Sequence, residues 1–189
     1  MKKIFAVMMS LMAAVAASAQ TEIQVPEYVG QVAVINADST TTLLERETAD
    51  IKVTSSKFGY IPIPGSSLLD KAKTNLVVKG KSSKTVLKGD TLTFIYRAEK
   101  NNIDPKEAFG IIKFEEKKKE RRYVMAEAGL LSGAKAMTSF NSIPSEAKKY
   151  GDECYIISVS NCEPGEYGFI TTDMSKVSTF SVIAEDEEK

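Results

Sequence analysis

Residues 154–171 read CYIISVSNCEPGEYGFIT, and this stretch decides the fold class that we expect. Successive side chains of a strand point to opposite faces, so apolar residues at every second position lie on one face. Large apolar residues recur in this way at Tyr155, Ile157 and Val159 and again at Tyr167 and Phe169. The Pro164-Gly165 pair between the two sets is typical of a turn. We therefore predict two strands that a tight turn separates.

The same two-residue period recurs along the rest of the chain, with turn residues between the segments. It predicts about ten short strands, a number typical of an antiparallel β-sandwich or barrel. We expect these strands at 28–36, 42–45, 51–54, 76–79, 92–97, 111–115, 121–125, 155–160, 167–171 and 177–183. Their large apolar residues form the predicted core.

Helix is expected only in one or two short turns. Asp104-Pro105-Lys106-Glu107 is a helix start, with Asp at the N-cap, Pro at the first helical position and Glu at the third. Gly110 follows closely, so this helix is short. Residues 144–151 are predicted as a second short helix that Gly151 ends.

A charged run at 115–122 reads EEKKKERR and lies between two apolar strands. One interpretation is a patch that binds an anionic ligand. The other is the solvated tip of a hairpin. We favour the hairpin tip because three Glu residues interrupt the basic ones.

Residues 58–73 form the longest irregular stretch, and a loop of this length in a compact domain is often functional or mobile. Phe58 and Tyr60 are the candidate ligand-binding residues there. Aromatic and Pro residues in this stretch either form a binding edge or fasten the loop to the rim of the sandwich, and the sequence favours neither.

Residues 162–167, CEPGEY, resemble the tyrosine corner of immunoglobulin-like and fibronectin-like sandwiches. In that motif a Tyr at the start of a strand hydrogen-bonds to the backbone where the chain changes sheets. The resemblance implies that Pro164-Gly165 is the turn and Tyr167 the corner residue. Cys162 stands where fibronectin domains usually have Leu, and the spacing from Pro to Tyr is one residue shorter. An ordinary Pro-Gly turn is the alternative.

The N-terminal residues 1–19 have the pattern of a secretory signal peptide. Lys2 and Lys3 precede an apolar run that is too short to span a membrane, and Ala17-Ser18-Ala19 fits a signal-peptidase site. We expect export to the periplasm, the cell surface or the medium. Residues 20–189 then form one β-sandwich domain, with a possible subdivision near 100–110. No second long apolar run follows, so no transmembrane segment is expected.

This exported β pattern resembles the uncharacterised secreted immunoglobulin-like sandwich proteins of Bacteroides-type bacteria. The resemblance rests on the general character of the chain and on the Pro-Gly-Glu-Tyr stretch at 164–167. It implies a fold and an exported location, but no activity and no site residues.

Composition excludes several kinds of chemistry. The 189-residue chain has 25 Lys+Arg against 25 Asp+Glu, and it has no His, which removes imidazole-based triads and metal sites. Zero formal net charge disfavours nucleic-acid binding. If 154–162 is extended, its ends lie about 26 Å apart, far beyond the reach of a disulfide. We therefore expect Cys154 and Cys162 to be unpaired.

These features predict a non-catalytic binding or structural protein of the cell envelope, whose partner is an unidentified envelope protein or glycan. No nucleotide-binding loop or nucleophile motif is present, and no cofactor, metal or catalytic residue is assigned. The alternative is a hydrolase that uses a pair of carboxylates, as glycosidases do. Two convergent carboxylates in a deep cleft would favour that alternative.

Overall fold

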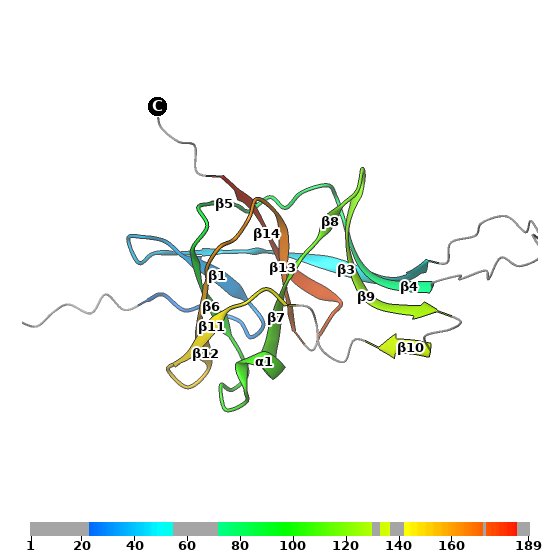
Figure 1. Cartoon of the computed structure of the whole chain (residues 1–189). Coiled ribbons are helices and arrows are strands. Elements are labelled where there is room, and N and C mark those ends of the chain that lie inside the picture. The colour runs from blue at the N-terminus through cyan, green and yellow to red at the C-terminus, as the bar shows by residue number, and fades with distance from the viewer. Residues whose placement is uncertain (1–22, 55–71, 130–132, 137–141, 172, 185–189) are drawn as a thin grey trace, which may run out of the picture.

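The computed structural model describes residues 23–54, 72–129, 133–136, 142–171 and 173–184, and these form an all-β protein with one short helix (Figure 1). The helix is α1 (Pro105–Ala108). The strands are β1 (Val32–Ile35), β2 (Thr41–Leu43), β3 (Glu45–Thr54), β4 (Ala72–Lys79), β5 (Val86–Lys88), β6 (Leu92–Arg97), β7 (Phe109–Lys113), β8 (Glu115–Glu116), β9 (Glu120–Gly129), β10 (Gly133–Ala136), β11 (Glu146–Tyr150), β12 (Cys154–Val159), β13 (Gly165–Thr171) and β14 (Lys176–Ile183).

The strands form two sheets. The first has the order β11-β12-β6-β1-β2, and the second has the order β10-β9-β4-β3-β14-β13-β7. Neighbours along both orders are antiparallel, whereas β5 adds to β14 in parallel and β8 pairs with β9. Each sheet combines strands from both sides of residues 100–110. The predicted all-β class is confirmed.

Strands β13 and β14 are buried on both faces, which sets the layering of the molecule. One face packs against the first sheet through an aromatic cluster, in which the Phe94 ring lies 5.0 Å from that of Phe169 and 5.1 Å from that of Phe180. The second sheet curls toward a barrel-like shape, so β3, β4 and β9 cover the other face. Leu76, Val78, Ile112, Ile170 and Val177 form a second apolar core there.

The prediction of a helix at 144–151 is wrong. Residues 146–150 form β11 and pair with β12, from Glu146 opposite Ser158 to Tyr150 opposite Cys154. The hydrogen bonds that β12 offers along its free edge override the local helix preference. Gly151, with φ of 57°, makes the hairpin turn instead of ending a helix. The helix predicted from Asp104 is confirmed, since the Asp104 carboxylate accepts a 2.9 Å hydrogen bond from the Lys106 N–H.

Several strand bounds also differ from prediction. Residues 28–31 form a turn before β1, because the Gln31 N–H donates to the Tyr28 carbonyl and Gly30 has φ of 83°. The predicted strand 111–115 is divided between β7 and β8. Strands β5 and β10 were not predicted, and β4 begins at Ala72, inside the stretch expected to be irregular.

Both cysteines are free and buried, as expected. Cys162 belongs to the core between the sheets, whereas Cys154 packs with Ala33 and Ile95 on the outer face of the first sheet. The predicted signal peptide at 1–19 lies outside the described residues. Within the described part of the chain, no helix has the length and apolar character needed to cross a bilayer.

Candidate ligand-binding site

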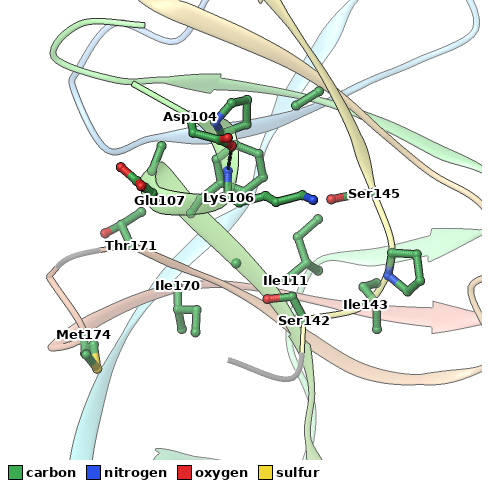
Figure 2. A pocket seen from close by; sticks show the side chains of 16 residues that line it. Asp104, Lys106, Glu107, Ile111, Ser142, Ile143, Ser145, Ile170, Thr171 and Met174 are labelled. Carbon is green, nitrogen blue, oxygen red and sulfur yellow. Dashed lines mark hydrogen bonds between the residues drawn. The ribbon is translucent and has the colours of Figure 1, made fainter. Parts of the chain in front are cut away.

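A pocket of about 950 Å³ opens where α1, the start of β7, residues 142–147 and the end of β13 meet (Figure 2). These segments are far apart in the sequence. The helix and the first residues of β7 form one wall, and residues 142–147, which lead into β11, form the opposite wall. Ile170, Thr171 and Met174 lie on the other side of β7, because β13 pairs with one edge of that strand and residue 143 lies along the other. We call this site the α1–β7 pocket.

Local hydrogen bonds fix the two walls. The Phe109 N–H donates to the Pro105 carbonyl, so the chain passes from helix directly into strand. The Ile143 N–H donates a 2.8 Å hydrogen bond to the Ile111 carbonyl, which holds residue 143 along the outer edge of β7. Gly110 allows this close approach, since a Cβ at that position would lie 2.7 Å from the Ser142 Oγ.

The floor of the pocket is apolar and is shared with both cores. Ile170 and Ile111 are 0% and 1% exposed and belong to the second core and to the core between the sheets, respectively. Partly buried Ile143 and Met174 pack against those same cores. A ligand on this floor would contact mainly Ile143 and Met174, which are partly exposed, whereas Ile170 and Ile111 are buried.

The rim of the pocket is polar. Asp104, Lys106 and Glu107 come from α1 and its cap, and Ser142, Ser145 and Thr171 lie on the other sides. In Figure 2 the Lys106 side chain extends toward Ser145 across the mouth of the pocket. The Asp104 carboxylate caps the helix, and both Lys106 and Glu107 are exposed to water. The rim can therefore orient a polar end of a ligand whose body lies on the apolar floor.

A second cluster is polar and mainly buried, and it lies near the other end of β13. Arg121 of β9 is 0% exposed. Its Nη2 donates a 2.6 Å hydrogen bond to the Glu47 Oε2. Its Nη1 donates a 3.4 Å hydrogen bond to the Glu166 Oε2. The predicted hairpin is confirmed as β8–β9, but a wholly solvated tip is wrong for Arg121. The pleat of β9 turns this one residue of the charged run inward.

Hydroxyl groups complete this cluster, which we call the Arg121 cluster. The Glu166 carboxylate accepts hydrogen bonds from the Ser83 N–H at 2.8 Å and from the Ser181 Oγ. The Thr179 Oγ1 donates to Glu47. Among the described buried side-chain polar atoms, the one without a hydrogen-bond partner is the Arg97 Nε, which lies outside the cluster. The Arg121 cluster is therefore structural, because its polar groups already form hydrogen bonds with one another.

The residues of the proposed tyrosine corner lie where the chain leaves the first sheet for the second. The Tyr167 hydroxyl donates a 2.7 Å hydrogen bond to the Glu163 carbonyl. Burial raises the pKa of the Tyr167 phenol, so the hydroxyl keeps its proton and remains a donor. A Cβ at Gly165, where φ is 149°, would lie 2.9 Å from the Lys113 Cε. The Pro164-Gly165 turn therefore passes close to Lys113 at the end of β7.

The predicted ligand-binding residues Phe58 and Tyr60 lie outside the described residues. The pocket that the structure does place was missed, because its walls come from three separate segments. Its one signal in the sequence is Asp104-Pro105, which indicates a helix start and a possible subdivision near 100–110 but not a pocket. Within the described residues, no group of three or more Cys, Asp or Glu side chains could hold a metal ion. Comparisons with protein-family models, curated proteins and solved structures find no match to this chain.

Proposed function

We propose that this chain is an exported, non-catalytic binding protein of the cell envelope, and that its ligand occupies the α1–β7 pocket. The observation that carries the proposal is the pocket itself, of about 950 Å³, with an apolar floor and a few polar rim groups. Pockets of this size and lining are typical of small-molecule sites. The ligand class that fits is a mainly apolar molecule with one polar end.

The positions of the acidic residues favour binding over the carboxylate-dependent hydrolase. Asp104 and Glu107 are the carboxylates of the pocket lining. Asp104 is engaged as the helix cap, and Glu107 lies in water on the same short helix. Glycosidases place two carboxyl groups on opposite sides of the scissile bond. Neighbouring positions on one helical turn do not provide that arrangement.

The finer fold assignment and the exported location are also part of the proposal. The change of sheet between β12 and β13 and the Tyr167 hydrogen bond support an immunoglobulin-like or fibronectin-like sandwich, enlarged by the β3–β4–β9 layer. The sequence of residues 1–19 supports export, as does the resemblance to secreted proteins of Bacteroides-type bacteria. N-terminal sequencing of the protein recovered outside the cytoplasm should begin at Gln20, and retention of residues 1–19 would contradict export by this signal.

Fluorescence titration with the neutral apolar dye N-phenyl-1-naphthylamine tests the binding site. The unmodified protein should bind the dye saturably, and decanol should displace it. Thr171→Trp places a large ring on the half-buried wall of the pocket and should weaken dye binding about tenfold or more, by analogy with filled apolar pockets. Thr42→Trp, on exposed β2, is the matched control and should leave dye binding unchanged.

Two results would overturn the pocket as the binding site. One is the absence of saturable binding of the dye. The other is equal weakening by Thr171→Trp and Thr42→Trp, which would show that the dye binds elsewhere or only at the general surface. Circular dichroism of each variant establishes that both substitutions leave the fold intact.

A further inference from the structure

Two neighbouring turns carry a concentration of lysine that the proposed function does not use. One is residues 79–83, which begin with the last residue of β4, and the other is residues 115–119, which comprise β8 and the tip of the β8–β9 hairpin. The whole chain has zero formal net charge, yet these ten residues hold five lysines and two glutamates. The lysines are Lys79, Lys81, Lys117, Lys118 and Lys119, and all are exposed. We call these turns the two-turn lysine surface.

The Arg121 cluster holds the two turns together from the inside. The Gly80 N–H donates a 2.9 Å hydrogen bond to the Lys119 carbonyl, which joins the turns directly. The Arg121 guanidinium donates to the Lys79 carbonyl at 3.2 Å and to the Gly80 carbonyl at 3.3 Å. These hydrogen bonds hold the backbone of the two turns side by side, and the lysine side chains of both turns are exposed.

Most of the lysine charge on this surface has no ion-pair partner among the residues that the structure describes. Lys117 forms an ion pair with Glu115. Among the described ion pairs, none involves Lys79, Lys81, Lys118 or Lys119. Lys81, Lys117 and Lys118 line one shallow hollow of about 550 Å³ together with Glu116. The hollow therefore has an excess of positive charge and is open to solvent.

We propose that the two-turn lysine surface binds the anionic headgroups of a lipid bilayer. The β8–β9 tip projects at the end of the molecule opposite α1 (Figure 1), and the Gly80–Lys119 hydrogen bond places the other turn beside it, so one flat surface can face both turns. Neither turn contains an aromatic residue on which a sugar or base could stack, or an apolar side chain that could enter the bilayer. The attraction is electrostatic, and the α1–β7 pocket stays open away from the membrane.

Sedimentation with lipid vesicles tests this proposal on the full chain. Vesicles of phosphatidylcholine with about one third phosphatidylglycerol should bind the protein, and phosphatidylcholine alone should not. Replacing Lys79, Lys81, Lys118 and Lys119 together by Gln should weaken binding at least about tenfold, since one lysine near an anionic surface contributes about fivefold. The matched control replaces exposed Lys88, Lys100, Lys148 and Lys149 by Gln, which gives the same net charge. Its binding should stay within about twofold of the unmodified protein.

Two further measurements use NaCl and the soluble acidic polysaccharide polygalacturonate. Raising NaCl from about 0.05 M to about 0.5 M should release the protein from the vesicles. Three results would overturn the proposal: no binding to the anionic vesicles, equal loss of binding in the two quadruple variants, or binding to soluble polygalacturonate without binding to vesicles. The last result would assign the surface to an acidic polysaccharide instead.

Discussion

The second core lies between strands β7, β13 and β14 on one side and strands β3, β4 and β9 on the other. The two ends of this core differ in chemistry. At one end the Arg121 cluster closes it with charged and hydroxyl groups that satisfy one another. At the other end lies the α1–β7 pocket, where Ile170 is buried and Met174 is partly exposed. Glu166 and Ile170 point to the same face of β13, four residues and roughly 13 Å apart. One strand thus carries both a closed polar end, which stabilises the fold, and an open apolar end, which is suited to a ligand.

The largest expected effect comes from removing the charge that closes the polar end. Arg121→Met leaves the Glu47 and Glu166 carboxylates without their cation, and such a loss at a buried pair costs about 3–5 kcal/mol of unfolding free energy. Urea denaturation followed by circular dichroism measures it. Arg122→Met, one position along β9 and partly exposed, should cost only about 0–1 kcal/mol. Equal effects of the two substitutions would mean that the buried cluster does not stabilise the fold.

The middle of the second core is closely packed, so a larger side chain there should destabilise the protein. A Cβ at Gly168 would lie 2.6 Å from the Val177 Cγ1 and 2.7 Å from the Phe114 Cε2. We expect Gly168→Ala to lower the free energy of unfolding by about 1–3 kcal/mol, as other overpacked cores do. Combining it with Val177→Ala should cost less than the sum of the two single substitutions, because the smaller side chain makes room. Strict additivity in this double-mutant cycle would contradict the packing described here.

Removing the hydrogen bond between Tyr167 and the Glu163 carbonyl should have a smaller effect on stability. Tyr167→Phe keeps the ring against Phe180 and removes only the bond to the Glu163 carbonyl. A loss of about 1 kcal/mol in the free energy of unfolding is expected. Tyr28→Phe, on a side chain that is 62% exposed, should change the stability by less than about 0.5 kcal/mol. No change for Tyr167→Phe would mean that this hydroxyl plays no structural part in the corner.

The reactivity of the two thiols should show that both are buried, and this measurement needs no substitution. Burial raises the pKa values of Cys154 and Cys162, so little reactive thiolate is present near pH 8. Both thiols should react very slowly with Ellman's reagent in the native protein and at once in urea, to a total of two. A count of zero in urea without reductant would show that the cysteines form a disulfide.

Sequence patterns predicted the apolar part of the fold better than the polar part. Leu92, Phe94 and Tyr96 place large apolar side chains at every second position, and the predicted strand 92–97 coincides with β6. Residues 146–150, EAKKY, carry no such alternation, and they form a strand because β12 lies beside them. Arg121 could not be separated from its charged neighbours, because its burial depends on Glu47 and Glu166 from distant strands. The α1–β7 pocket could not be predicted either, because its lining residues come from three segments that are distant in the sequence.

An NMR titration of the ¹⁵N-labelled protein with N-phenyl-1-naphthylamine tests the central claim, which is that the ligand binds at the apolar end. The amide signals of Gly110, Ile111, Ile143 and Thr171 should shift with one saturable dependence on dye concentration. Those of Gly80, Ser83 and Glu166 at the polar end should stay in place. Shifts centred on the polar end, or shifts spread over the surface without saturation, would contradict this account.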